Sequence, residues 1–457
     1  MDYSAANRGL WEFVITLGIM SLSLGAALVL RNRFTFIRRS MMPTAVLAGF
    51  LLLIARETGL IRLNMEILET LVYHSIAMGF IAMSLRKALR PIGKDGKREG
   101  RVTGIKSGAI IVGTYLIQGI TGLAISMILA VFIPRVFQAS GLLLHMGFGQ
   151  GPGQANNIGA TYESMGFAGG RSYGMAIAAA GYLCACTVGV WILRRWSRKP
   201  VPATGRIKKE TAEEADIRMF QAPNEIPVSD SIDRFSVQII LVFSVYLATY
   251  LLIRGLTSLI GTLAPGLGDT VNTLLWGFNF ILGSALAMLV SKVMDVCQQK
   301  GRMIREYRNN YLLSRLSGLF FDLMITAGIA SISIEDISGL WIPFIITVIA
   351  GATVTWFFLK WAAARAYPGY QREGLISMYG MLTGTIGSGI LLLKEIDPNM
   401  DTPAAGNLVI GSSYGIVLGA PLLLFVSLAA KSTALCLATF ALIVVYWAVL
   451  AMIIRKK

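Results

Sequence analysis

The sequence predicts an all-α polytopic membrane protein, and three observations support this fold class. The 457 residues are 55% hydrophobic and 14% charged, with a mean hydropathy of +0.64, whereas soluble domains carry about 25% charged residues. Apolar windows close to the roughly 20 residues of a spanning helix recur along the whole chain. Two glycine-rich polar loops interrupt this pattern, each between apolar stretches about half that long.

The apolar windows of about spanning length are expected to be transmembrane helices. The first shows neither a basic segment nor a small-residue cleavage site before it, so we expect it to stay in the mature protein. The two interrupted regions, 138–168 and 374–397, are expected to form re-entrant helical hairpins. The eleven predicted spans lie at about 11–30, 41–60, 64–85, 109–134, 171–193, 235–260, 271–292, 313–333, 339–360, 406–428 and 432–454.

The distribution of basic residues predicts the orientation. With the N-terminus outside and one crossing for each span, 34 of the 41 Lys and Arg residues fall in segments on the cytoplasmic side. A Lys/Arg excess in short cytoplasmic loops is what sets the topology of such proteins. The net charge of +16 is therefore an orientation signal, and no nucleic-acid partner is expected. The C-terminus is expected to be cytoplasmic.

This topology predicts two inverted five-helix repeats, each with a re-entrant hairpin, and one extra C-terminal transmembrane helix. The first repeat spans 1–194, a cytoplasmic linker 195–234, the second repeat 235–428 and the additional helix 429–457. Two sequence echoes occupy equivalent places in the repeats. These echoes pair Ser172-Tyr-Gly-Met175 with Ser413-Tyr-Gly-Ile416, and His74…Gly79-Phe-Ile-Ala82 with Asp322…Ala327-Gly-Ile-Ala330.

The two loops, Gly149-Gln-Gly-Pro-Gly-Gln-Ala-Asn-Asn157 and Thr383-Gly-Thr-Ile-Gly-Ser-Gly389, are the candidate functional site. Broken helices at membrane depth survive only inside protein or beside a watery cavity, and paired interruptions in two halves indicate a transporter's substrate site. Each hairpin arm is about 15 Å long, so both tips are expected near the bilayer midplane. Two helix N-termini meeting there would form an anion site.

The tip residues offer amide, hydroxyl and backbone groups for a small polar substrate. The predicted substrate-binding residues are Gln150, Gly151, Gly153, Gln154, Asn156, Asn157, Thr383, Gly384, Thr385, Gly387 and Ser388. Asp322, Asn157 and Thr385 are the predicted ligands of sodium, a hard cation that prefers oxygen. Asp322 has a structural alternative, as a buried acceptor that caps a broken helix.

Four neighbouring ionisable residues have open roles. His74 is expected to be a satisfied interior histidine. Arg171 is either an interfacial anchor or a partner of an acidic substrate. For Glu163 and Asp397, helix capping and ion binding are alternatives. No Walker A motif, metal-ligand constellation, Ser/Lys dyad or pair of midplane carboxylates occurs in the sequence, so neither an on-chain ATPase nor an enzyme is expected.

At these residues the chain resembles the bacterial sodium/glutamate symporter family. The first hairpin carries the resemblance in Gly151-Pro-Gly-Gln-Ala155, Gly159, Glu163, Gly166-Phe167 and the Ala-rich span from Tyr173. The second carries it in Gly384-Thr-Ile-Gly-Ser-Gly-Ile-Leu-Leu-Leu-Lys-Glu-Ile-Asp-Pro398, Thr402-Pro-Ala-Ala405 and Pro421. Where family members commonly show His and Thr in the first tip, this chain has Pro152 and Gln154. It also has Gly387-Ser388 where Pro-Thr is frequent.

The resemblance implies a sodium-coupled symporter in the bacterial inner (plasma) membrane, with sodium as coupling ion and a small carboxylate, glutamate first, as substrate. It also implies a homodimer and elevator-type alternating access, in which a hairpin-bearing domain moves against a scaffold. A hydroxycarboxylate or other organic anion is the alternative substrate. An anion channel is the alternative outside the carriers, because broken helices also serve channels.

Overall fold

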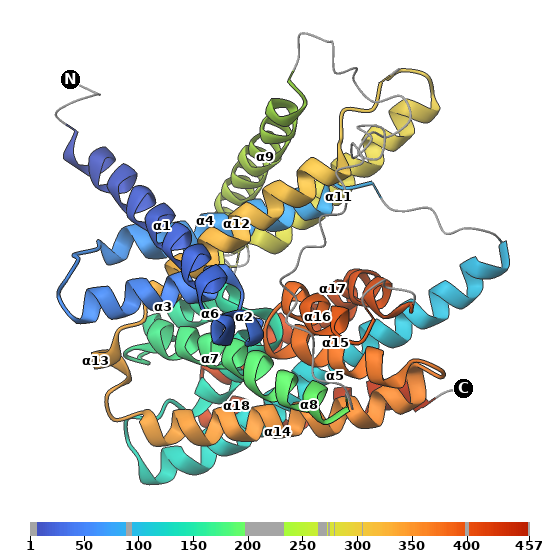
Figure 1. The fold of residues 1–457 in the computed structure, drawn as a ribbon. Helices are drawn as coiled ribbons and strands as arrows, with labels where there is room; N and C mark the ends of the chain where they lie inside the picture. Colours follow the sequence, from blue (N-terminus) through green and yellow to red (C-terminus); the bar gives the residue numbers. More distant parts are fainter. Residues whose placement is uncertain are drawn as a thin grey trace. The chain divides into compact units, whose positions relative to one another are not determined.

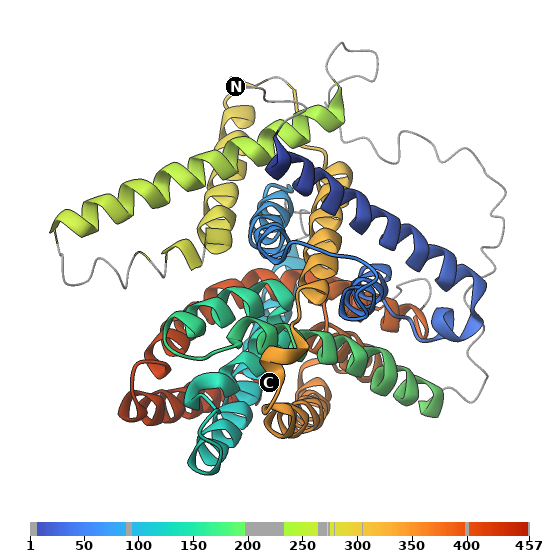
Figure 2. The same ribbon diagram turned by 90° about the vertical axis from the view of Figure 1, so that its left-hand side faces the viewer.

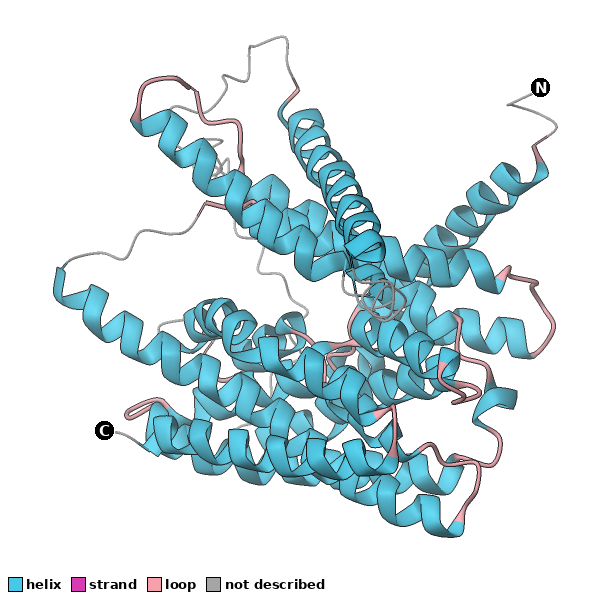
Figure 3. Ribbon diagram, turned by 180° about the vertical axis from the view of Figure 1, so that it is seen from behind, coloured by secondary structure: helices cyan, strands magenta, loops and turns pink. Residues whose placement is uncertain are grey.

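The computed structural model describes residues 7–87, 94–196, 233–263, 272, 275–277, 279–303, 305–397 and 402–455, and these residues form helices and no β-strand (Figure 3). The linker predicted at 195–234 lies almost entirely outside the described residues. Within the described residues, nine helices are long and apolar enough to cross a membrane. This confirms the prediction of an all-α polytopic membrane protein.

The long helices lie at the predicted spans, in the predicted order (Figure 1). A tenth candidate is α17 (Ala404–Ala429), which is bent by 48° and counts as a span when its two parts are taken together. The nine candidate spans are α1 (Arg8–Arg33), α4 (Met65–Ser84), the Val102–Phe132 part of α5 (Lys94–Phe132), α7 to α8 (Gly170–Trp196), α9 (Arg234–Leu263), α11 (Asn279–Gln299), α12 (Asn310–Ala330), α14 (Trp341–Ala366) and α18 (Thr433–Arg455).

The span predicted at 41–60 is shorter in the structure. Its helix, α3 (Thr44–Glu57), has only 14 residues. Pro43 stands at its N-cap, and Gly59 has φ of +74°, a left-handed conformation that ends helices. At ~1.5 Å rise per residue, α3 covers about 21 Å, which is less than a ~30 Å hydrocarbon core.

The chain divides into two compact units that do not follow the order of the sequence. Unit 1 takes in the described residues of Met1–Leu68, Pro91–Gly205 and Thr326–Lys457, and so contains both predicted hairpins. Unit 2 takes in those of Glu69–Arg90 and Arg206–Ile325. Each unit therefore draws helices from both predicted repeats.

Unit 1 is built around α5, which packs against α14, α17 and α18 (Figures 1 and 2). Buried aliphatic and aromatic side chains from these helices and from the second hairpin form its main core, including Ile110, Phe358, Tyr379 and Leu408.

Unit 2 has a separate core between α4, α9, α11 and α12. Ile81, Val242, Ala287 and Leu313 are fully buried in it. Gly79 of α4 lies against the ring of Phe321, where a Cβ would come within 2.7 Å of the ring. The close approach of α4 to α12 therefore depends on a residue with no side chain.

The two sequence echoes make reciprocal contacts. Tyr173, at the start of α7, packs edge-on against Phe344 of α14, with ring centroids 6.3 Å apart. Its counterpart Tyr414 packs against Gly104 and Gly108 of α5. Each tyrosine thus contacts the fourth long segment of the opposite half of the chain.

The second echo behaves in the same way. Gly49 of α3 lies against Ile329 near the end of α12, and Gly283 of α11 lies against Ile81 near the end of α4. Ile81 and Ile329 occupy the same place in the echoed segments. The second helix of each half therefore approaches the third helix of the other through a glycine.

Candidate functional site

The first predicted hairpin is a broken pair of helical segments. The incoming arm is a 3₁₀ helix, η1 (Gln138–Leu142), followed by a π-helix, η2 (His145–Gln150). Gly151 then has φ of +96°, and the outgoing helix α6 (Pro152–Ser164) begins with proline at its first turn. Proline fits there because the first helical N–H has no intrahelical acceptor. The sequence predicted the break, but not the π-helix before it.

The second hairpin is broken at the predicted place as well. Helix α15 (Gln371–Thr383) ends before Gly384, whose φ and ψ are −141° and −105°, and α16 (Ile386–Lys394) follows after an extended Thr385. The two arms pack closely where a Cβ on Gly389 would lie 2.4 Å from the Ser377 carbonyl oxygen. Small residues at this crossing let the arms touch.

The two tips come together in unit 1, and η2 contacts α15 directly. Helix α7 (Gly170–Cys184) packs against both of them. A Cβ on Gly147 would lie 2.8 Å from the backbone nitrogen of Ala178, and one on Gly181 would lie 2.3 Å from the carbonyl oxygen of Thr383. The structure thus brings the incoming arm of the first hairpin, which ends at Gln150, against the first arm of the second, which ends at Thr383.

Most polar side chains of the tips are buried. Gln154, Asn156 and Asn157 are 6%, 4% and 5% exposed, and Thr383 is fully buried with its hydroxyl donating to the Tyr379 carbonyl. Gln150 and Thr385 are half-buried, and Gly387 is exposed. These last three residues are therefore the accessible part of the two tips.

Two buried polar atoms at the tips make no hydrogen bond, namely Asn156 Oδ1 and Ser388 Oγ. Ser388 Oγ lies close to the break, 3.0 Å from where a Cβ of Gly384 would stand. Leaving a buried polar atom without a partner costs about 1–3 kcal/mol. Such atoms are therefore candidates for contacts with a bound ligand.

The sequence did not single out Gln118, which lies between the two tips. Its amide nitrogen donates to Thr355 Oγ1 of α14 at 2.8 Å and to the Leu382 carbonyl near the end of α15 at 3.0 Å. On the other side, a Cβ on Gly149 would be 3.0 Å from Gln118 Oε1 and 2.4 Å from the Tyr115 ring. A lone glutamine in an apolar window carries no local signal of such contacts.

The residues that flank the tips have structural partners. Glu163 accepts a hydrogen bond from the backbone N–H of Arg171 at 2.9 Å and pairs with its guanidinium at 3.1 Å. Asp397 accepts from the backbone N–H of Thr402 at 3.0 Å and from its hydroxyl at 2.6 Å. For Glu163 and Asp397, these contacts match capping, the first of the two predicted alternatives.

Asp322 and His74 lie in unit 2, whereas Asn157 and Thr385 lie in unit 1. The sodium site predicted from Asp322, Asn157 and Thr385 therefore remains a prediction. His74 Nδ1 is 2.5 Å from the hydroxyl of Tyr246 in α9, within unit 2. This hydrogen bond satisfies the imidazole, but His74 is exposed, so it is not the interior histidine that was expected.

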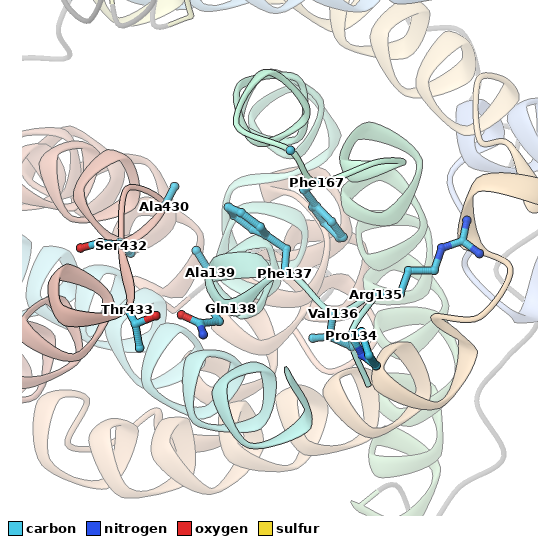
Figure 4. A pocket seen from close by; sticks show the side chains of 12 residues that line it. Pro134, Arg135, Val136, Phe137, Gln138, Ala139, Phe167, Ala430, Ser432 and Thr433 are labelled. Atoms are coloured by element: carbon cyan, nitrogen blue, oxygen red, sulfur yellow. The ribbon is translucent and has the colours of Figure 1, made fainter. Parts of the chain in front are cut away.

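A cavity of about 290 Å³ lies among the described residues (Figure 4). It is lined by the segment 134–139 after α5, by Gly166 and Phe167 at the hairpin exit, and by residues of the α17–α18 loop. Phe137 and Phe167 stack beside it with centroids 5.4 Å apart. None of the predicted substrate-binding residues lines this cavity.

Comparison with known proteins gives no assignment, because no protein-family model matches the chain and no curated protein matches it.

Proposed function

We propose that the protein is a sodium-coupled symporter of a small carboxylate, with glutamate as first candidate, that works by elevator-type alternating access as a homodimer in the bacterial inner membrane. The observation that carries the proposal is the meeting of two broken helical hairpins in unit 1. Long apolar helices surround a small set of buried polar groups, as a carrier's substrate site requires.

The helix ends at the tips suit a carboxylate. Helices α6 and α16 both begin at the break, and their first N–H groups have no intrahelical acceptor. Helix N-termini attract anions through these N–H groups and the helix dipole. Asn156 and Ser388 add buried polar atoms that make no hydrogen bond within the protein.

The reciprocal contacts of the echoes support two inverted repeats. If the halves are related by a two-fold axis in the membrane plane, any contact of the first half on the second must have a counterpart in the other direction. Tyr173 with α14 and Tyr414 with α5 form one such pair of contacts. Gly49 with Ile329 and Gly283 with Ile81 form another.

The division into units supports the elevator mechanism. Both hairpins, α7 and α17 belong to one unit, whereas α4, α9 and α11 belong almost entirely to the other. A site built within a single unit can be carried across the membrane by a rigid-body movement of that unit. The resemblance to sodium/glutamate symporters supports the substrate class, the coupling ion and the homodimer.

The test is uptake of radiolabelled glutamate by proteoliposomes that contain the purified protein. Moving one charge through 100 mV is worth about 2.3 kcal/mol, so entry of a monoanion into a negative interior requires at least two cations per cycle to be driven by the potential. We expect saturable, sodium-dependent uptake that carries net positive charge inward. Electroneutral transport would contradict this stoichiometry, and flux that does not saturate would indicate a channel.

A thermal-shift screen against amino acids and carboxylates, with and without sodium, identifies the substrate. Stabilisation by citrate or malate and not by glutamate would favour the hydroxycarboxylate alternative. Ser388→Ala tests the site itself, because its hydroxyl makes no hydrogen bond in the protein. We expect unchanged stability and substrate affinity reduced by up to about tenfold, the value of one hydrogen bond. Ser412→Ala, whose hydroxyl donates to the Leu408 carbonyl in α17, is the matched control.

A further inference from the structure

The orientation of the Gln118 amide is determined by its partners. The carbonyl oxygen of Leu382 can only accept a hydrogen bond, so the amide nitrogen of Gln118 must face it. A flipped amide would place two carbonyl oxygens against each other. The Thr355 hydroxyl accepts the second amide hydrogen. The side-chain oxygen of Gln118 therefore points away from α14 and α15, toward Gly149 of the first tip.

This oxygen is a buried acceptor with no donor. Gln118 is fully buried, and its Oε1 makes no hydrogen bond. Burying this oxygen is unfavourable, because it has lost its hydrogen bonds to water and has formed none within the protein. The Nε2 bonds hold the amide in place, so the oxygen cannot turn to find another partner.

The helix ends around this oxygen favour a cation. Helix α15 ends at Thr383 and η2 ends at Gln150, so the last carbonyl groups of both segments have no partner within their own helix. Helix C-termini carry a partial negative charge, and carbonyl ends of broken helices coordinate sodium in transporters. The N-terminal ends of α6 and α16, which suit an anion, lie on the other side of each break.

We propose that Gln118 Oε1 is a ligand of a monovalent hard cation, held between the end of η2 and the end of α15. Neutral amide and carbonyl oxygens match sodium better than a divalent ion, which prefers carboxylates. No group of three or more His, Cys, Asp or Glu residues that could hold a metal occurs in the described part of the chain. The assignment of this cation as the coupling ion rests on the proposed function, but the binding site does not.

The test is binding of ²²Na⁺ to the full-length protein in lipid nanodiscs, without substrate and with choline as the replacing cation. Gln118→Met keeps the length of the side chain and removes the amide, and Gln118→Asn withdraws the oxygen by one methylene. We expect both to raise the Kd for sodium at least about tenfold. Thr355→Val is the matched control, because it removes one partner of the amide nitrogen and leaves the Leu382 contact that orients the oxygen. We expect its Kd to stay within about twofold of the wild type.

A second measurement uses the unmodified protein, in case the variants do not fold. Sodium should slow amide hydrogen exchange at both tips, in 144–153 and 378–385, while potassium and choline should not. Unchanged exchange, or sodium affinity retained in both Gln118 variants, would overturn the site. Sodium-driven uptake with wild-type sodium affinity in Gln118→Met would refute this site and leave the proposed function standing. If Gln118→Met abolishes sodium binding but the wild type takes up no carboxylate, the sodium site stands and the proposed function is refuted.

Discussion

Arg308 in unit 2 shows how this protein accommodates a fully buried charge. Its guanidinium is 0% exposed and donates to Glu306 Oε1 at 2.8 Å, Asp295 Oδ1 at 2.6 Å and Ser291 Oγ at 2.7 Å. The Lys87 ammonium adds a second cation at 3.0 Å from Glu306. Buried charges survive only when paired and hydrogen-bonded, and this cluster ties the end of α4 to α11 and α12.

The cluster predicts a pH-dependent stability. Burial alone would raise the pKa of the Glu306 carboxyl, but hydrogen bonds from Arg308 and Lys87 outweigh it and lower the pKa below its ordinary value. A lowered pKa stabilises the fold above the unfolded value of about 4.3, and this contribution is lost as the pH falls through the folded value. We expect Glu306→Gln to cost about 3–5 kcal/mol at pH 7, because a buried pair is broken.

Thermal unfolding in detergent between pH 7 and pH 3 measures both effects. The wild type should lose stability below about pH 4.3, and Glu306→Gln should lose less over the same range because it lacks the titrating group. Glu335→Gln, at an exposed position in α13 (Ile334–Ile337), is the control and should behave like the wild type. Parallel pH curves for Glu306→Gln and the wild type would contradict the assignment.

At the scale of elements, the incoming arm of the first hairpin is held by a crossing with no side chains. A Cβ on Gly122 of α5 would lie 2.0 Å from the carbonyl oxygen of Gly141, and a Cβ on Gly141 would lie 1.9 Å from that of Gly122. Backbone therefore touches backbone here, and neither partner is a flexible side chain that can move aside. The position of η1, and through it the tip, depends on this contact.

Gly122→Ala is therefore expected to separate the two segments. Overpacking typically costs 1–3 kcal/mol, and with rigid backbone on both sides we expect about 3 kcal/mol and impaired ligand binding at the tip. Gly119→Ala, one turn earlier, meets nothing closer than His145 Nδ1 at 3.4 Å. It should be neutral or stabilising by up to ~1 kcal/mol, since alanine favours helix. Equal melting temperatures of the two variants would refute the crossing.

Glycine and proline residues that end helices explain which elements the sequence could predict. Gly151 and Pro152 break the first hairpin, and Gly384 the second, through the conformations that these residues allow. Pro43 and Gly59 shortened α3, although the apolar window that contains them reads as a full span. Gln118 could not have been predicted, because Thr355 and Leu382 lie more than 230 residues away in the chain. The π-helical turn of η2 likewise packs against α5 and α7, two segments that the local sequence of the hairpin does not specify.

At the scale of the whole molecule, the proposed topology places the two halves in opposite orientations in the membrane. The reciprocal contacts of Tyr173 and Tyr414 suit an inverted pair, and inversion requires each loop of the first half to face the side opposite to its counterpart in the second. The hairpins must also enter from different faces. If a single loop lay on the opposite side of the membrane from its predicted side, the two halves would not be inverted repeats. The tips would then not be expected to meet at the centre of the bilayer.

Cysteine labelling in intact cells tests this arrangement directly. The four native cysteines, Cys184, Cys186, Cys297 and Cys436, would first be replaced by alanine. A membrane-impermeant maleimide should then label Leu60→Cys, Ser164→Cys and Glu335→Cys in intact cells. Phe36→Cys, Lys300→Cys and Lys394→Cys should react only after permeabilisation. All six positions are exposed in the structure, so poor reactivity after permeabilisation cannot be ascribed to burial.

The pair at the hairpins, Ser164 and Lys394, decides the point on which the site depends. Ser164 ends α6 and Lys394 ends α16, so each reports the face to which its hairpin returns. If only Ser164→Cys is labelled from outside, the two hairpins enter the membrane from opposite faces. Their half-length arms then bring both tips to a similar depth. Labelling of both from the same side would leave the contact between the tips intact but remove its place at the midplane, and the carrier mechanism would fail with it.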